Sequence, residues 1–189
     1  MKVTLASSNK GKLAEFQQLL SGLNFDVVPQ SEFQVPDAIE NGLSFVENAI
    51  IKARHASKLT GLPAIADDSG LEVDFLNGAP GIYSSRFSGE NATDEKNNQR
   101  LLSLLQEAEE NERTARFQCL LVYMRHPEDP TPIICQGTWE GLITLSPEGE
   151  NGFGYDPLFY IPEFGCTSAQ LEKTQKNKVS HRGKAMAQL

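Results

Sequence analysis

Residues 3–20 read VTLASSNKGKLAEFQQLL, and this stretch indicates the fold class. The apolar run Val3–Ala6 is typical of a short buried strand. After the polar segment 7–12, apolar residues resume with the spacing of one helix face, at Leu13, Phe16, Leu19 and Leu20. The chain is therefore predicted to open with a strand, a polar loop and a helix.

Further helices are predicted from their caps. Ser44 and Glu47 have the spacing of a capping box, which predicts a helix from Phe45 to about Leu59. Thr93 is expected to cap a helix over residues 94–109, whose apolar face consists of Leu101, Leu102, Leu104 and Leu105. Helical segments are also expected near the C-terminus, with candidate caps at Thr167, Ser168 and Ser180.

Predicted strands alternate with these helices, at Phe25–Val28, Ala64–Ala66, Leu71–Leu76, Ala115–Met124 and Leu158–Ile161. The segment Ile133–Ile143 is predicted to form two strands around Gly137 or Gly141. An acidic turn is expected at residues 67–70, and a long loop at residues 77–91. This mixed order of strands and helices favours an α/β fold with a mixed sheet.

The length and the charge limit the classes of partner. A chain of 189 residues suggests one domain, or one domain split into two lobes. Its 17 Lys and Arg and 25 Asp and Glu give a net charge of -8, which repels nucleic-acid polymers and anionic membrane surfaces. No stretch approaches the roughly 20 apolar residues of a membrane span. The cysteines, Cys119, Cys135 and Cys166, are too far apart for a zinc or redox pair, so we expect free thiols and a cytoplasmic protein.

The polar segment 7–12, between the first strand and the first helix, is a candidate anion site. Free backbone N–H groups and the positive end of the helix dipole favour anions there, and hydroxyl groups and lysines add donors. A helix cap with exposed lysines explains the same residues equally well. The segment is not a P-loop, because the chain lacks the required glycine and lysine spacing.

Ser44, Asn48 and Lys52 form a polar stripe along the helix predicted after Ser44. Such a stripe is more often the solvated face of a surface helix than a functional site.

Asp67 and Asp68 are candidate functional acids. Because side chains alternate along a strand, the two carboxylates should point to opposite faces rather than share a proton. One of them could hold Mg²⁺, together with a nearby acid such as Glu40. The alternative is a common Asp-Ser-Gly turn whose acids bond their own backbone.

The segment Gly152–Asp156 places Phe153 and Tyr155 on either side of a glycine, where two rings could clamp a flat base and Asp156 could read its edge. Aromatics beside glycine are more often core residues at a tight turn. A donor cluster follows near the C-terminus, at Lys176, Ser180, His181, Arg182 and Lys184. The alternative for this cluster is a cationic helix start that binds nothing. Taken together, the anion site, the acids, the aromatic pair and the donor cluster describe a nucleotide site.

The ordered motifs of the chain are SSNKGK at 7–12, FVENAIIKA at 45–53, ADDSGL at 66–71, GAPGIYSSR at 78–86, GFGYDP at 152–157 and SHRG at 180–183. Through these motifs the sequence resembles, over nearly its whole length, the Ham1-like inosine triphosphate pyrophosphatases, and especially their bacterial dITP/XTP pyrophosphatase branch. The resemblance implies Mg²⁺-dependent hydrolysis of ITP, dITP and XTP to the monophosphate and pyrophosphate, which removes deaminated purines from the nucleotide pool. It also implies a homodimer of a single two-lobed domain over residues 1–189, with a long mixed β-sheet flanked by helices and an active-site cleft between the lobes.

The resemblance assigns roles to matching residues. Asp68 is implied to be the proton acceptor that activates water, and Asp68 and Glu40 to be the Mg²⁺ ligands. The implied phosphate-holding residues are Lys12, Lys52, Ser7, Ser8, Asn9, Lys10 and Gly11. Ser69 would contact the substrate, and the residues implied to hold or read the base are Phe153, Gly154, Tyr155, Asp156, Lys176, His181 and Arg182.

Two other functions fit the same residues. A non-catalytic purine nucleotide sensor would use the pocket without hydrolysis. A metal-dependent phosphomonoesterase would release orthophosphate directly from a monophosphate. Identification of the products separates these alternatives.

Overall fold

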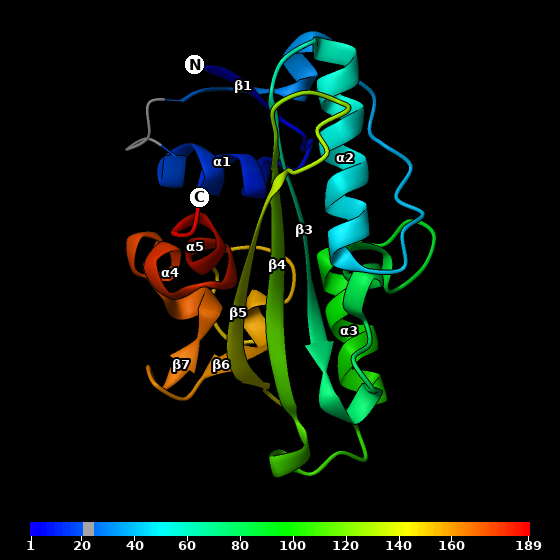
Figure 1. Ribbon diagram of the computed structural model, residues 1–189. Coiled ribbons are helices and arrows are strands. Elements are labelled where there is room, and N and C mark those ends of the chain that lie inside the picture. The colour runs from blue at the N-terminus through cyan, green and yellow to red at the C-terminus, as the bar shows by residue number, and fades with distance from the viewer. Residues whose placement is uncertain (21–24) are drawn as a thin grey trace. The chain divides into compact units, whose positions relative to one another are not determined.

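A computed structural model describes residues 1–20 and 25–189, and shows an α/β fold built on one seven-stranded sheet (Figure 1). The strands are β1 (Lys2–Leu5), β2 (Asp26–Pro29), β3 (Ala64–Val73), β4 (Thr114–Met124), β5 (Ile133–Ile143), β6 (Phe159–Ile161) and β7 (Cys166–Thr167), in the sheet order β2-β1-β3-β4-β5-β6-β7. Strand β1 pairs in parallel with β2 and β3, whereas β6 pairs antiparallel with β5 and β7. The predicted mixed sheet is therefore confirmed.

The helices are α1 (Lys10–Leu20), α2 (Phe45–Thr60), α3 (Asp94–Leu104), α4 (Lys173–Val179) and α5 (His181–Met186). Short 3₁₀ turns lie at Gln30–Phe33, Asp74–Leu76, Gly81–Arg86, Glu110–Glu112, Asp156–Leu158 and Ser168–Gln170. The second and third of these turns shorten the predicted strand 71–76 and occupy part of the predicted loop 77–91. Within residues 1–20 and 25–189, no helix is long and apolar enough to span a bilayer.

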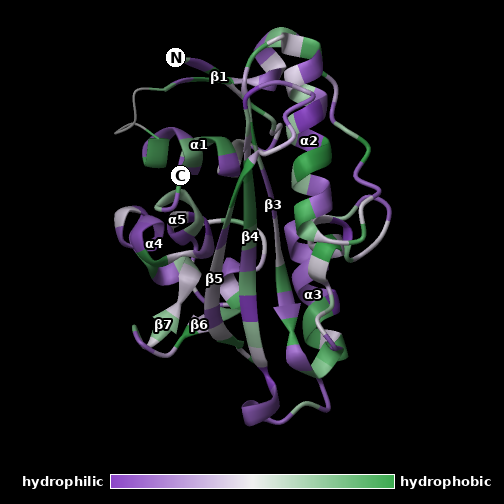
Figure 2. Cartoon of the chain, viewed as in Figure 1, coloured by the Kyte–Doolittle hydropathy of each residue, from purple (hydrophilic) through white to green (hydrophobic). Residues whose placement is uncertain are grey.

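The predicted capping of α2 is confirmed. The Ser44 hydroxyl accepts a hydrogen bond from the Glu47 N–H at 3.4 Å, and Gly61 ends the helix in the left-handed region with a φ of 69°. Figure 2 shows hydrophobic and hydrophilic residues interspersed along this helix. Its buried face consists of Phe45, Asn48, Ala49, Ala53, Ala56 and Ser57.

Helix α3 begins as predicted but ends earlier. The Thr93 hydroxyl accepts from the Lys96 N–H at 3.2 Å, whereas the helix stops at Leu104 instead of near residue 109. The buried Arg113 guanidinium donates to the carbonyls of Leu105 and Ala108, which satisfies acceptors that a longer helix would have used. Leu101 and Leu105 are buried as expected, but Leu104 is 44% exposed.

Two strand predictions are wrong. Strand β3 runs without a break through the predicted acidic turn, because the carboxylates of Asp67 and Asp68 pair with cationic side chains instead of with their own backbone. Strand β5 likewise passes through Gly137 and Gly141 as one strand. A Cβ at Gly141 would lie 2.5 Å from the Tyr160 carbonyl oxygen, so this glycine allows close approach of β6 rather than a turn.

The C-terminal caps are only partly as predicted. Thr167 caps a 3₁₀ turn, Ser168–Gln170, through a capping box with Gln170. Ser180 occupies the C-cap of α4 and directly precedes α5. The cap prediction at Thr167 therefore identified a turn and not a longer helix.

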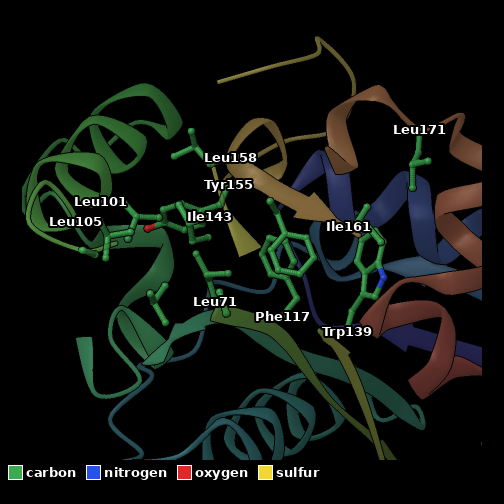
Figure 3. Packing of buried hydrophobic residues seen from close by; sticks show 14 residues of the cluster. Leu71, Leu101, Leu105, Phe117, Trp139, Ile143, Tyr155, Leu158, Ile161 and Leu171 are labelled. Carbon is green, nitrogen blue, oxygen red and sulfur yellow. The ribbon is translucent and has the colours of Figure 1, made fainter. Parts of the chain in front are cut away.

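The chain divides into two compact units. The first unit comprises Met1–Ser69, Cys119–Gly137 and Arg182–Leu189, and the second comprises Gly70–Gln118 and Thr138–His181. Each unit has its own apolar core, and that of the second, around Phe117, Trp139 and Tyr155, is shown in Figure 3. By these bounds β3, β4 and β5 contribute residues to both units.

Candidate active site

Asp67 and Asp68 lie in the middle of β3 in the first unit, and each meets cations from different helices. The Asp67 carboxylate accepts from Lys12 Nζ of α1 at 2.9 Å, and Arg182 Nη2 of α5 lies 3.5 Å from it. Burial alone would raise the pKa of Asp67, but the charges of Lys12, Arg182 and Lys52 hold it well below its ordinary range. Asp67 is therefore a buried carboxylate that is charged at neutral pH and anchors two cationic side chains.

Asp68 forms a second cluster with Lys52 of α2. Lys52 Nζ donates to Asp68 Oδ1 at 2.8 Å and lies 3.4 Å from Glu40 Oε1. Burial raises the pKa of Asp68 above its ordinary value, although the positive charge of Lys52 opposes this shift. Burial alone would lower the pKa of Lys52, but the nearby carboxylates of Asp68, Asp67 and Glu40 outweigh it and raise that pKa. The structure thus brings Glu40, Lys52 and Asp68 together.

The polar stripe on α2 is not the solvated face of that helix. Ser44 caps the helix, Asn48 is fully buried, and Lys52 joins the two carboxylates. Asn48 accepts from the Gly42 N–H and its amide donates to Asp68 Oδ2 at 3.4 Å. Ser44 makes the local capping contact that its spacing predicts, whereas Asn48 and Lys52 make tertiary contacts that the helical spacing alone does not reveal.

The segment 7–12 caps α1, as one interpretation of its sequence predicted, but its Lys12 is not exposed. The Asn9 side chain accepts from the Lys12 N–H at 3.0 Å and caps α1, while the Ser8 hydroxyl donates to Asp37 and the Ser7 hydroxyl accepts from the Asn9 N–H. Lys12 is not an exposed cap lysine, because it is held by Asp67. Gly11 lies in the first turn of α1, and the side chain of Lys10 lies outside the described part of the structure.

Arg182 is a member of the Asp67 cluster. Its guanidinium is 2% exposed, and it contacts the carboxylates of Glu15 and Asp67 and the Ser69 hydroxyl. Burial alone would lower the pKa of Arg182, but the charges of Asp67 and Glu15 raise it. Ser69 in turn donates to Asp67 at 2.6 Å, so Arg182, Ser69 and Lys12 share one carboxylate.

The second unit brings together Phe153, Asp156 and Lys176. The buried Asp156 carboxylate accepts from Lys176 Nζ at 2.6 Å, from the Phe153 N–H at 2.9 Å and from the Ser168 hydroxyl at 2.8 Å. Lys176 Nζ also lies 5.3 Å from the centre of the Phe153 ring. A Cβ at Gly152 would lie 2.1 Å from Asp156 Oδ2, so glycine is required for this loop to close on the carboxylate.

The other candidate base-binding residues have structural contacts in the second unit. Tyr155 is buried in the core (Figure 3). Its hydroxyl donates to the Ser84 carbonyl at 2.7 Å. The Gly154 N–H donates to Asp94 at 2.7 Å. The His181 ring stacks on Phe117 with a centroid distance of 4.8 Å. Tyr155 thus occupies the core position that aromatics beside glycine usually take, and its base-clamping role stays a prediction.

The structure adds one buried acid, Glu15, to the candidate site residues, and gives Asp67 a role that the family resemblance does not assign. Glu15 lies on α1 and pairs with Arg182, which is 167 residues away in the chain, so no local pattern marks it. Asp67 is one of the two candidate acids, but the sequence does not show that it anchors Lys12 and Arg182. Its one sequence signal is an acid next to the candidate base in an otherwise apolar strand.

The donor set around Asp68 fits a hard divalent cation with few protein ligands. In the described residues, no group of three or more His, Cys, Asp or Glu side chains is arranged to hold a metal ion. Asp68 and Glu40 nevertheless converge on one lysine ammonium, which occupies a place suited to positive charge. Mg²⁺ is typically held by one or two carboxylates, with water and substrate phosphates completing its coordination. These two acids are sufficient for that mode of binding.

The sequence is similar to one family of known proteins over nearly its whole length. The model of the Ham1 family matches residues 3–189. A dITP/XTP pyrophosphatase of Vibrio cholerae is 60% identical over 188 residues, which cover 100% of this chain and 94% of that protein. A dITP/XTP pyrophosphatase of Escherichia coli O157:H7 is 58% identical over 185 residues, covering 98% of this chain and 94% of that protein.

Solved structures are similar over the same length. A HAM1 protein from Coxiella burnetii superposes with a TM-score of 0.93 at 53% identity, covering 100% of this chain and 95% of that one. A nucleoside-triphosphatase, dITP/XTP pyrophosphatase, from Mycobacterium abscessus has a TM-score of 0.78 at 41% identity, covering 100% of this chain and 97% of the other.

Proposed function

This chain belongs to the Ham1 family, and we propose that it hydrolyses dITP, XTP and ITP to the nucleoside monophosphate and pyrophosphate. Such an enzyme removes deaminated purine nucleotides from the nucleotide pool. The names and the high identity of its full-length relatives support this activity. In the structure, the observation that carries it is the cluster of Asp68, Lys52 and Glu40, which unites a proton acceptor, a phosphate-binding cation and a second acid.

Asp68 acts as the proton acceptor for the attacking water. Its raised pKa makes the carboxylate a better base than an exposed aspartate, and Lys52 fixes Oδ1 so that the carboxylate keeps one orientation. Attack at the α-phosphorus breaks the α-β phosphoanhydride, and pyrophosphate leaves. Positioning and charge neutralisation supply most of the catalysis in such phosphoryl chemistry, so no covalent nucleophile is required.

The family implies a divalent metal ion, and we propose that it is Mg²⁺, held by Glu40 and Asp68. When bound, Mg²⁺ neutralises charge on the phosphates and on the departing pyrophosphate. Lys52 contacts both acids, so it keeps the two carboxylates close although their charges repel.

The triphosphate is held by Lys12, Lys52 and the segment 7–11 of the first unit. Lys12 lies in the first turn of α1, where backbone N–H groups and the helix dipole also favour anions. Asp67 holds the Lys12 ammonium, so the Lys12 side chain has already lost part of its flexibility before substrate binds. Ser69, next to Asp68 on β3, contacts the substrate.

The purine base is held by Phe153 and Tyr155 and read by Asp156, Lys176, His181 and Arg182. A 6-keto purine presents an acceptor where adenine presents an amino donor. A fixed cationic donor such as Arg182 therefore favours hypoxanthine and xanthine over adenine. The buried ion pairs of Lys176 and Arg182 support this role, because they fix the direction in which each side chain donates.

Residues 1–189 form a single two-lobed domain that acts as a homodimer in the cytoplasm, on small nucleotides rather than on nucleic-acid polymers. The match of one family model to residues 3–189 supports the single domain, and the net charge of -8 supports the preference for small ligands. The described cysteines are all free, as expected for a reducing compartment. Light scattering of the purified protein over a range of concentrations tests the dimer.

The deciding experiment is steady-state hydrolysis of a panel of dITP, XTP, ITP, ATP and GTP with Mg²⁺, with products identified by chromatography. We expect monophosphate and pyrophosphate from the first three and much slower turnover of the last two. Binding without product formation would instead indicate a nucleotide sensor. Orthophosphate released directly from a monophosphate would indicate a phosphomonoesterase.

A further inference from the structure

Asn48 lies on the buried side of α2, between two acid-bearing segments of the first unit. Its side chain is fully buried, and it accepts a hydrogen bond from the Gly42 N–H at 2.9 Å. Its amide nitrogen lies 3.4 Å from Asp68 Oδ2. One asparagine therefore connects the loop before α2 with strand β3.

The two partners of Asn48 fix the orientation of its amide. The Gly42 N–H requires an acceptor, and the Asp68 carboxylate requires a donor. A flipped amide would lose both contacts, and the Asn48 side chain is too buried to replace them with bonds to solvent. Asn48 is thus satisfied in one orientation only, and each of its polar groups serves a different segment.

The loop is packed closely against this amide. A Cβ at Gly42 would lie 2.7 Å from Asn48 Oδ1 and 2.6 Å from Glu47 Cβ. Glycine is therefore the residue that allows the loop backbone to reach Asn48. Glu40 lies two residues before this contact, so the position of its backbone depends on where the loop is anchored.

Asn48 and Lys52, one turn apart on α2, together hold both acids. Lys52 contacts the carboxylates of Glu40 and Asp68, whereas Asn48 contacts the Asp68 carboxylate and the Gly42 N–H, two residues after Glu40. Lys52 thus links the two acids through one long side chain. Asn48 adds a short, buried link between Asp68 and the loop backbone near Glu40.

We propose that Asn48 is a positioning residue that fixes Glu40 and Asp68 relative to each other before a divalent cation binds. The proposal rests on the proposed function, in which these two acids hold the metal. Asn48 itself touches neither metal nor substrate; it acts through its hydrogen bonds to the ligand-bearing segments. Outer-shell partners of this kind typically change metal affinity or activity by about 10- to 100-fold when they are removed.

The test compares Asn48→Ala with a matched control, Asn97→Ala. Asn97 is also buried and also lies four residues after a helix cap, at Thr93, just as Asn48 follows Ser44. It accepts from the Ser88 N–H and donates to the Ser85 carbonyl, so it anchors a loop without touching a carboxylate. Both substitutions remove a buried amide that bridges a loop and a helix, and both are expected to lower the melting temperature.

Mn²⁺ binding is measured first, on the full protein without nucleotide, from the electron paramagnetic resonance signal of free Mn²⁺. We expect Asn48→Ala to weaken Mn²⁺ binding by about 10- to 100-fold. Asn97→Ala should leave it unchanged. Unchanged Mn²⁺ affinity in Asn48→Ala, or an equal loss in both variants, would overturn the positioning role.

Gly42→Ala tests the hydrogen bond between Gly42 and Asn48 by changing the loop residue. It replaces Asn48→Ala in the test if that variant does not fold. The added methyl group should displace the loop from Asn48, so this variant also weakens Mn²⁺ binding. If the two residues act through one contact, the double variant is no weaker than the worse single variant. Additive losses, or wild-type Mn²⁺ affinity in Gly42→Ala, would contradict a shared contact.

Turnover of ITP provides a separate readout. In an active protein, Asn48→Ala should lower kcat more than it changes KM, because the triphosphate contacts remain. A wild-type protein that binds Mn²⁺ but hydrolyses no triphosphate would refute the proposed function and leave the Mn²⁺ comparison valid. An active wild type with an unaffected Asn48→Ala would refute only the inference about Asn48.

Discussion

The carboxylates of Asp67 and Asp68 lie on opposite faces of β3, although the two residues are neighbours in the chain. Asp67 meets Lys12 of α1 and Arg182 of α5, while Asp68 meets Lys52 of α2. The alternation of side chains along a strand separates Asp67, which anchors two cationic side chains, from Asp68, which we propose as the proton acceptor. Their environments also shift their pKa values in opposite directions, downward for Asp67 and upward for Asp68.

Asp68→Asn is expected to abolish turnover of ITP while the fold survives. The amide keeps the size of the side chain but cannot accept the proton of the attacking water, so kcat should fall by about 10²–10⁴-fold. Pyrophosphate release measures the loss, and circular dichroism during heating checks the fold. A variant with wild-type kcat would remove Asp68 from the mechanism.

Asp67→Ala is expected to destabilise the protein far more than Asp74→Ala. Removing Asp67 takes a carboxylate away from Lys12 and Arg182. Removing one partner of a buried ion pair lowers the free energy of unfolding by about 3–5 kcal/mol. Asp74 pairs with Arg116 at the surface, where such pairs contribute about 0–1 kcal/mol. Urea unfolding of both variants gives the two free energies, and equal losses would show that burial does not matter here.

The contribution of Asp67 to stability should disappear in acid. Its pKa is lowered in the folded protein, so the unfolded chain binds a proton more readily, and the stabilisation is lost as the pH falls below about 4. The difference in free energy of unfolding between the wild type and Asp67→Asn should therefore be full at neutral pH and shrink below this value. A pH-independent difference would refute the linkage.

Arg182→Ala is expected to reduce the discrimination between ITP and ATP. Loss of a charged hydrogen bond to the 6-keto oxygen should cost about 1–3 kcal/mol in the ratio of kcat/KM values. Glu15→Gln provides a control, because it weakens the anchor of Arg182 but keeps the guanidinium. Unchanged ratios in Arg182→Ala would assign base recognition to other residues and leave Arg182 an anchor of the Asp67 cluster.

The cysteines should differ in reactivity. Burial, assisted by the negative charge of Asp67, raises the pKa of Cys119 to about 11, and burial also raises the pKa of Cys135. Cys166 is only half-buried. Iodoacetamide at about pH 8 should therefore modify Cys166 first in the native protein, as read by mass spectrometry, because alkylation requires an accessible thiolate. Modification of Cys119 before unfolding would contradict its burial.

Local chemistry was enough to predict the elements that depend on neighbouring residues. The caps at Ser44 and Thr93 act within one helical turn, so their positions follow from the sequence. The opposite orientation of Asp67 and Asp68 follows from strand geometry in the same way. The order of the strands and helices was sufficient for the α/β class.

The errors arise where a distant residue changes the local preference. The acidic segment 67–70 has turn chemistry, but lysines and an arginine from three helices keep it extended within β3. Gly141 has the sequence signature of a turn, but it serves the close approach of β6. The early end of α3 likewise depends on Arg113, which lies beyond the helix.

Residue type and short spacing are enough to specify the α/β class, the helix caps and the set of acids and lysines. Which of these charges meet depends on how the whole chain packs. The pairing of Glu15 with Arg182 joins residues 167 positions apart, and the hydrogen bonds of Asn48 join a loop to a strand. Burying a charge or an amide is favourable only when a complementary group arrives with it, and that condition is met by the packing of the chain, not by any one segment.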